Sequence, residues 1–176
     1  YLPQHPFKNA PQVTMERDEG LAPWPRTKEV ISDQLCEYYG LVTHLDEQVG
    51  RVLEALKKSP HADNTIVIYT ADHGLAMGSH GLLGKQNVYE QSMSSPLILS
   101  GPGVKPGQIT EPVSLIDIAP TIAECFGLSK RPYSGKSLLG DIAANRTVLS
   151  EYHDGGSVKG LPSAASTATS PPPCRV

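Results

Sequence analysis

The clearest pattern of apolar and polar positions lies in residues 28–58. Apolar side chains recur there in alternating steps of four and three, which aligns them along one face of a helix for about seven turns. Lys57 and Lys58 suit the negative C-terminal end of a helix, and Pro60 stops it. We therefore predict a helix over 28–58 whose apolar stripe is buried against a sheet. The stripe consists of Ile31, Leu35, Tyr38, Val42, Leu45, Val49, Val52 and Leu56.

Short apolar runs after this helix predict strands. Residues 65–71 (TIVIYTA) are apolar and rich in β-branched side chains, which is typical of a buried parallel strand. Residues 96–100 (PLILS) predict a second strand, and residues 147–150 predict a short final one. A further helix is expected from Asp117, which can cap it, to about residue 126. Helix followed by strand is the repeating unit of an α/β fold.

The two ends of the chain differ from its middle in composition. The first 26 residues contain five prolines, so we expect an extended, irregular segment there. Beyond Gly155 the chain consists mainly of Gly, Ser, Ala, Thr and Pro, which cannot bury enough apolar surface to order themselves. The sequence thus predicts one folded region over 1–154 and a disordered, low-complexity tail over 155–176.

Composition and charge exclude several classes of protein. A length of 176 residues suits a single domain with a core of its own. The formal net charge of −3 gives no sign of nucleic-acid binding. The chain contains no run of about 18 apolar residues, so we expect no membrane-spanning helix.

Candidate chemistry is concentrated in residues 69–90 (YTADHGLAMGSHGLLGKQNVYE). Asp72 and His73 directly follow the predicted strand 65–71, and open α/β sheets bind ligands at the carboxyl ends of their strands. The Asp72 carboxylate suits Ca²⁺ or Mg²⁺, whereas imidazole is an unusual ligand for such hard cations. From spacing alone, two alternatives remain open: a metal site, or a turn in which Asp72 caps the loop.

Several stretches of the chain, taken in order, resemble the sulfatases of the alkaline-phosphatase superfamily. The resemblance covers roughly residues 1–150 and is closest to the iduronate-2-sulfatase-like and choline-sulfatase-like branches, where the pair after the strand is Asp-His. It implies an α/β fold, a partial alkaline-phosphatase-like sandwich whose mostly parallel sheet is flanked by helices. The stretches are LPQHPF, YYGLVTHLDEQVGRVLEAL, HADNTIVIYTADHG, HGLLGKQNVYE, PLILSGPG and LIDIAPTIAECFGL.

This resemblance implies a hydrolase of sulfuric esters, acting on a sulfated small molecule or carbohydrate. It implies one divalent cation, usually Ca²⁺ with Mg²⁺ as an alternative, bound by Asp72 and His73. Two other functions remain open: a phosphonate or phosphodiester hydrolase of the same superfamily, and an incomplete domain that catalyses nothing. By family analogy the protein would be periplasmic, secreted or lysosomal.

The resemblance also assigns roles to Lys85 and two histidines. Lys85 matches the lysine that contacts the sulfate, and the glycines before it allow the loop to fold back over the strand end. His80 either joins the substrate pocket or supports the glycine-rich loop. In the family, a Pro-His-x-Pro-Phe histidine contacts the sulfate or protonates the leaving group. Here His5 stands one place later and is the candidate for that role, while Gln4 takes the usual position, so which of the two occupies the family position stays open.

The nucleophile of the family is missing from this sequence. Sulfatases attack sulfur with a formylglycine made from Cys or Ser in a C-x-P-x-R motif. Cys174, in PPCRV, does not match this motif, and neither do the other cysteines. We therefore expect the chain to be the C-terminal part of a sulfatase catalytic domain, inactive by itself, with the formylglycine not encoded here.

Overall fold

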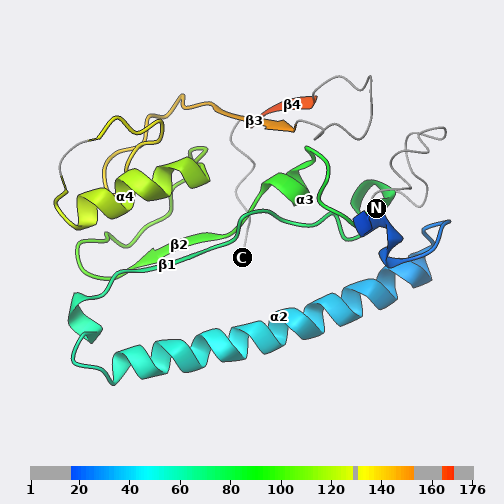
Figure 1. The fold of residues 1–176 in the computed structure, drawn as a ribbon, viewed down its shortest axis with the longest axis horizontal. Coiled ribbons are helices and arrows are strands. Elements are labelled where there is room, and N and C mark those ends of the chain that lie inside the picture. The colour runs from blue at the N-terminus through cyan, green and yellow to red at the C-terminus, as the bar shows by residue number, and fades with distance from the viewer. Residues whose placement is uncertain (1–16, 129–130, 153–163, 169–176) are drawn as a thin grey trace.

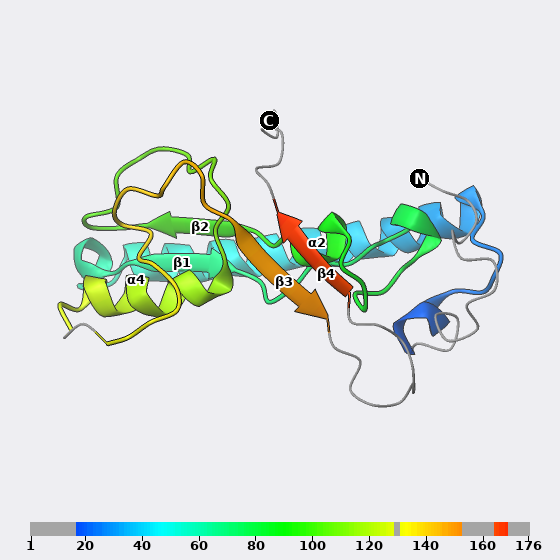
Figure 2. The ribbon, with the colours of Figure 1, turned by 90° about the horizontal axis from the view of Figure 1, so that it is seen from above.

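A computed structural model of the chain describes residues 17–128, 131–152 and 164–168. A pair of strands, β1 and β2, lies between the long helix α2 on one face and the shorter helix α4 on the other (Figures 1 and 2). The elements are η1 (Arg17–Leu21), α2 (Lys28–Lys57), η2 (Ala62–Asn64), β1 (Val67–Thr70), η3 (Ser79–Gly81), α3 (Glu90–Met93), β2 (Leu97–Ser100), η4 (Leu115–Asp117), α4 (Ile118–Cys125), β3 (Val148–Tyr152) and β4 (Ala164–Ala168).

Helix α2 confirms the strongest sequence prediction to within one residue at its end. Thr27 is its N-cap, and the Thr27 hydroxyl accepts a hydrogen bond from the Val30 N–H at 3.3 Å. Lys58 is its C-cap, directly after a lysine in the last turn. Both ends therefore follow from residues that favour these positions.

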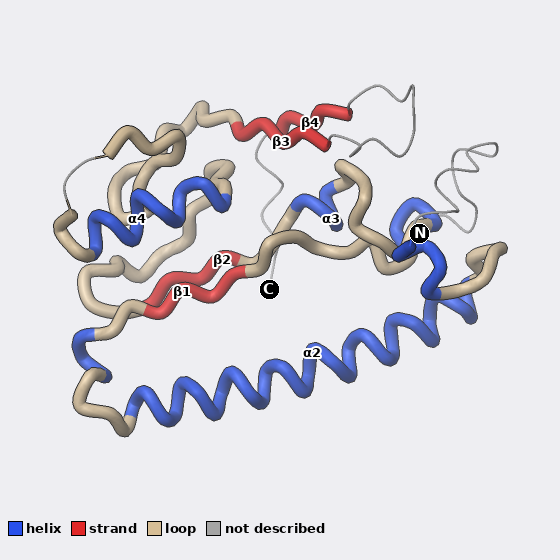
Figure 3. The backbone as a smooth tube through the Cα atoms, in the orientation of Figure 1, coloured by secondary structure: helices blue, strands red, loops and turns tan. Residues whose placement is uncertain are grey.

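The predicted strands 65–71 and 96–100 appear as β1 and β2, but their pairing differs from the prediction. They pair antiparallel, with Val67 opposite Ser100 and Thr70 opposite Leu97. A parallel pair needs a long crossover, usually a helix, whereas this connection runs toward the start of α2 and returns through the single-turn helix α3 (Figure 3). The prediction of a buried parallel strand is thus wrong here, and β1 is only half-buried.

The other predicted helix is shorter than expected and begins differently. Helix α4 spans Ile118–Cys125, and Gly127 follows it with a φ of 59°. The Asp117 side chain does not cap α4. It belongs instead to a capping box of η4, in which its Oδ2 accepts the Ser114 N–H at 2.8 Å.

A small cluster of buried apolar residues lies at the end of the molecule where α2 begins, and Ala123 and Leu138 are buried at α4 and in the segment after it. Ala22, Ile31 and Leu83 form the cluster, where η1, the first turn of α2 and the loop after β1 meet. The predicted burial of the α2 stripe is wrong further along the helix, where Val42 is 44% and Leu45 50% exposed. Little of the described chain therefore covers that part of α2. Of the other predicted positions, Leu35, Tyr38, Val49 and Leu56 are half-buried, and Val52 is exposed.

The last described strands lie at the C-terminal end of the chain. The predicted strand 147–150 appears as β3, which pairs antiparallel with β4. Strand β4 lies within the tail for which we expected no order, while the rest of that tail lies outside the described residues. The division at residue 154 stays a prediction. Within the described ranges, no helix is long and apolar enough to cross a membrane.

Candidate functional site

Asp72, His73 and Lys85 meet at one point beyond the end of β1. The Lys85 Nζ lies 2.8 Å from His73 Nε2, and Asp72 Oδ2 lies 3.2 Å from the same nitrogen. His73 is about one-third exposed and Asp72 largely exposed, so solutes can reach both. The loop therefore returns its lysine to the strand end, as the resemblance implied and as the glycines between His73 and Lys85 allow.

The hydrogen bonds around His73 indicate which ring nitrogen carries the proton. Nδ1 lies 3.0 Å from the Gly74 carbonyl oxygen, which can only accept, so the proton is assigned to Nδ1. Nε2 then accepts a hydrogen bond from the Lys85 ammonium. Asp72 Oδ2 lies 3.2 Å from the same nitrogen, so the polar neighbours of Nε2 are an ammonium and a carboxylate.

Two acceptors, Asp72 Oδ2 and His73 Nε2, fit part of a divalent-cation site. Two adjacent ligands of a cation with bonds of about 2.3 Å are separated by about 3.2 Å. Asp72 Oδ2 and His73 Nε2 have this separation. Among the residues that the structure describes, no group of three or more acidic, histidine or cysteine side chains could hold a metal. Asp72 and His73 therefore offer two ligands, and a bound cation needs further ligands beyond them.

The loop that carries Lys85 back is a narrow ladder of backbone hydrogen bonds. The tip of the loop lies over the start of α2. Gly78, at this tip, has a φ of 98°, and a Cβ on Gly78 would lie 2.4 Å from Ile31 Cγ2 of α2. Only glycine fits both the backbone angle and the contact. The rungs are Ala76 N–H to Gly84 O (3.0 Å), Met77 N–H to Leu83 O (3.3 Å) and Gly78 N–H to Leu82 O (2.7 Å).

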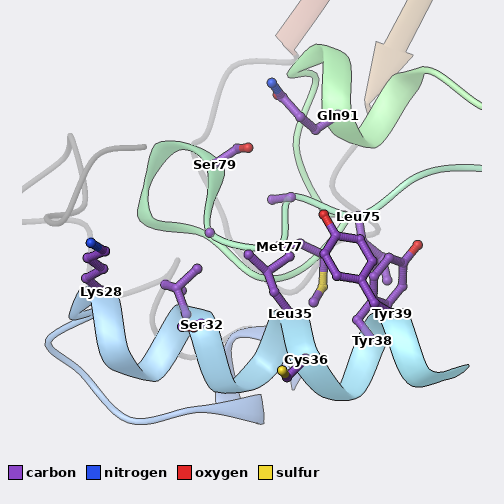
Figure 4. Close-up of a pocket in the computed structure, with 13 residues that line it drawn as sticks. Lys28, Ser32, Leu35, Cys36, Tyr38, Tyr39, Leu75, Met77, Ser79 and Gln91 are labelled. Atoms are coloured by element: carbon purple, nitrogen blue, oxygen red, sulfur yellow. The ribbon is translucent and has the colours of Figure 1, made fainter. Parts of the chain in front are cut away.

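An open groove lies beside this loop but is separate from the cluster of Asp72, His73 and Lys85. Its volume is about 760 Å³, and α2 and loop residues 75–79 form its walls (Figure 4). Tyr38 and Tyr39 of α2 face Met77 of the loop across it. None of the three cluster residues lines this groove.

The other predicted site residues are not joined to the cluster. The His80 ring stacks on Tyr89, with ring centroids 3.7 Å apart and an interplanar angle of 11°. Within the described ranges, no hydrogen bond or ion pair connects His80 to Asp72, His73 or Lys85. His5 and Gln4 lie outside the described residues.

Sequence reasoning missed a buried ion pair beneath the loop. Glu19 and Arg26 lie 3.1 Å apart, and their side chains are 5% and 0% exposed. Burial lowers the pKa of Arg26, while the charge and hydrogen bond of Glu19 act in the opposite direction. Charged side chains are rarely fully buried, so an isolated arginine in a sequence indicates a surface position. Glu19 accepts a hydrogen bond from the Leu83 N–H, and these two residues are 64 positions apart. No local sequence motif connects them.

A family model and the curated relatives both match this chain to sulfatases. The family model described as Sulfatase matches residues 3–128. Choline-sulfatase of Rhizobium meliloti is 34% identical over 133 residues, covering 72% of this chain and 26% of the relative. The chain thus spans about a quarter of that relative's length.

Solved structures give the same result for the fold. Phosphonate monoester hydrolase from Silicibacter pomeroyi superposes with a TM-score of 0.66 at 34% identity, covering 72% of this chain and 26% of that one. A protein solved in complex with its substrate D-glucosamine-2-N,6-O-disulfate superposes with a TM-score of 0.67 at 25% identity, covering 91% and 35%. The α/β fold is therefore that of the alkaline-phosphatase-like sulfatases, present here with a partial sheet.

Proposed function

The chain belongs to the sulfatase family, and we propose that it is part of a hydrolase that cleaves sulfate esters of small molecules or carbohydrates. The observation that carries this proposal is the meeting of Asp72, His73 and Lys85 beyond β1. Two acceptors and an ammonium at one accessible point suit a tetrahedral anion held together with a cation.

In this proposal Asp72 and His73 hold the divalent cation, Ca²⁺ in the first place and Mg²⁺ as the alternative. The bound cation would neutralise charge on a sulfate oxygen. His73 Nε2 has one lone pair, so it cannot serve Lys85 and a cation together. Lys85 would then leave His73 and donate to a sulfate oxygen, where a compact ammonium stabilises the negative charge.

The nucleophile and the remaining cation ligands are proposed to lie in another part of a longer protein. Two facts support this: the chain spans about a quarter of the choline-sulfatase it matches, and its sequence has no C-x-P-x-R motif. His5 remains proposed as the residue that contacts the sulfate or protonates the leaving group. Without a nucleophile, the 176-residue chain should be inactive.

A phosphonate or phosphodiester hydrolase is the second candidate. The likeness to the phosphonate monoester hydrolase from Silicibacter pomeroyi supports it as directly as the choline-sulfatase match supports the first. Both candidates require a tetrahedral anion beside Asp72, His73 and Lys85. They differ in the ester that is cleaved, which these three residues do not determine.

The test compares three esters on the longest protein encoded by the reading frame. An aryl sulfate, a phosphonate monoester and a phosphodiester are supplied with Ca²⁺, and we expect the aryl sulfate to have the highest kcat/KM. Asp72→Ala should abolish turnover, whereas Asp63→Ala, an exposed aspartate in η2, should leave it unchanged. Faster cleavage of the phosphonate would favour the second candidate. Turnover by the 176-residue chain that depends on Asp72 would contradict the proposed location of the nucleophile.

A further inference from the structure

Glu19 accepts hydrogen bonds from the backbone N–H groups of the two residues that directly precede Lys85. The Gly84 N–H donates to Glu19 Oε1 at 2.8 Å, and the Leu83 N–H lies 3.1 Å from both carboxylate oxygens. Glu19 is 4% exposed and Leu83 fully buried. A buried negative charge is thus bonded to the returning arm of the loop.

The Glu19 carboxylate is itself fixed in place. The Arg26 guanidinium pairs with it at 3.1 Å and also donates to the carbonyl oxygens of Ala22 and Glu19. The guanidinium lies over the Trp24 ring, 4.4 Å from its centroid. Because Arg26 is fully buried and bonded on several sides, Glu19 has little freedom to change rotamer.

Both backbone polar groups of Gly84 are hydrogen-bonded. Its N–H is bonded to Glu19, and its carbonyl oxygen accepts the Ala76 N–H from the outgoing arm at 3.0 Å. A Cβ on Gly84 would lie 2.8 Å from Asp18 Cβ and 3.1 Å from Glu19 Oε1. Glycine therefore permits the close approach that brings η1 against the loop.

Lys85 follows this fixed peptide, and the next residue is also tied to η1. The Gln86 side-chain Nε2 donates to Asp18 Oδ2 at 3.2 Å. Glu19 therefore holds the backbone before Lys85 and Asp18 holds the side chain of the residue after it, while the Lys85 side chain ends 2.8 Å from His73. We propose that Glu19 is a positioning residue for Lys85, which directs the ammonium to the strand end. The proposal rests on the function proposed above for Lys85.

The proton position on His73 reports whether Lys85 is in place, without any assay of activity. The ¹⁵N chemical shifts of the His73 ring are measured on the 176-residue chain with a chelator, at about pH 8, where an ordinary imidazole is neutral. In the wild type we expect the proton on Nδ1, since the Gly74 carbonyl oxygen accepts from Nδ1 and Lys85 donates to Nε2. Lys85→Met should move the shifts toward a mixture of the two tautomers, and Glu19→Gln should move them the same way.

A matched control separates positioning from general loss of stability. Asp117 is also a buried carboxylate paired with an arginine, and Asp117→Asn should leave the His73 shifts unchanged. Gly84→Ala, which pushes the loop away from Glu19, should reproduce the effect of Glu19→Gln and replaces it if that variant does not fold. Wild-type shifts in either loop variant would overturn the proposal. Expected shifts in a protein that cleaves no ester would reject the proposed function and leave the positioning of Lys85 standing.

Discussion

Two buried carboxylates, Glu19 and Asp117, make nearly the same contacts in different regions of the molecule. Glu19 pairs with Arg26 at 3.1 Å, and Asp117 pairs with Arg146 at 2.7 Å. Each carboxylate also accepts two backbone N–H groups. The donors are Leu83 and Gly84 for Glu19, and Ser114 and Lys136 for Asp117.

The two regions differ in what the held backbone carries. Lys85 follows the peptides bound by Glu19, and its ammonium meets His73. Lys136 donates its own N–H to Asp117, yet its side chain is exposed and bonds to no described residue. In both regions a buried ion pair therefore fixes irregular backbone. A functional role depends on the side chain that the fixed backbone presents.

Breaking the two ion pairs should give the largest effects. Arg26→Ala leaves the Glu19 carboxylate buried without its counter-charge and should lower the free energy of unfolding by about 3–5 kcal/mol. Arg146→Ala should cost less, because the Arg146 side chain is 14% exposed and water can replace part of its contact. Denaturant unfolding of both variants measures the difference, and equal losses would contradict it.

Removing the two lysines should separate the regions by function. In the longer protein, Lys85→Ala should lower kcat/KM for a sulfate ester on the order of 10²-fold, as for other lost electrostatic donors. Lys85→Arg should not restore it fully, since a planar guanidinium does not replace a compact charge. Lys136→Ala should stay within about threefold, as expected for a surface change. If kcat/KM of Lys85→Ala also stayed within about threefold of wild type, Lys85 would not contact the sulfate.

Combining Glu19 and Lys85 variants should show that they act together. Glu19→Gln should lower kcat/KM by about tenfold, which corresponds to about 1.4 kcal/mol. If Glu19 acts through Lys85, the Glu19→Gln/Lys85→Ala double variant should be no slower than Lys85→Ala alone. Asp117→Asn combined with Lys85→Ala should instead show independent, multiplying effects. Multiplying effects in the Glu19 pair would make Glu19 a stabilising residue only.

The sequence predicted elements and local chemistry well where the signal is local. Helix α2 has its cap, its stripe and its stop within one segment, and both ends agree with the structure. The meeting of Asp72, His73 and Lys85 agrees with the resemblance to sulfatases, which assigned Lys85 to the site, and with glycines that allow the loop to fold back over the strand end. Both cases depend on residues that are close together in the chain.

Features that depend on distant partners could not be predicted in the same way. The periodicity of α2 indicates which face is apolar but not what covers it, so Ile31 is 4% exposed while Val52 is 68% exposed. The direction of β2 depends on the path of the connecting loop. Glu19 and Gly84 are 65 positions apart, and no spacing rule joins them.

The smallest effect is a pH dependence of stability that arises from Asp117. Burial raises the pKa of this carboxyl, but hydrogen bonds from Arg146, the Lys136 N–H and the Ser114 N–H, with the charge of Arg146, lower it below the ordinary value. A lowered pKa in the folded state stabilises the fold above the unfolded pKa of about 3.9, and this stability is lost as the pH falls further. Unfolding free energies measured across this acidic range should therefore fall less steeply for Asp117→Asn than for wild type. Arg146→Met should lie between them, because it removes one cause and leaves both backbone hydrogen bonds in place. Equal slopes in all three proteins would show that the Asp117 contacts do not favour its ionised form.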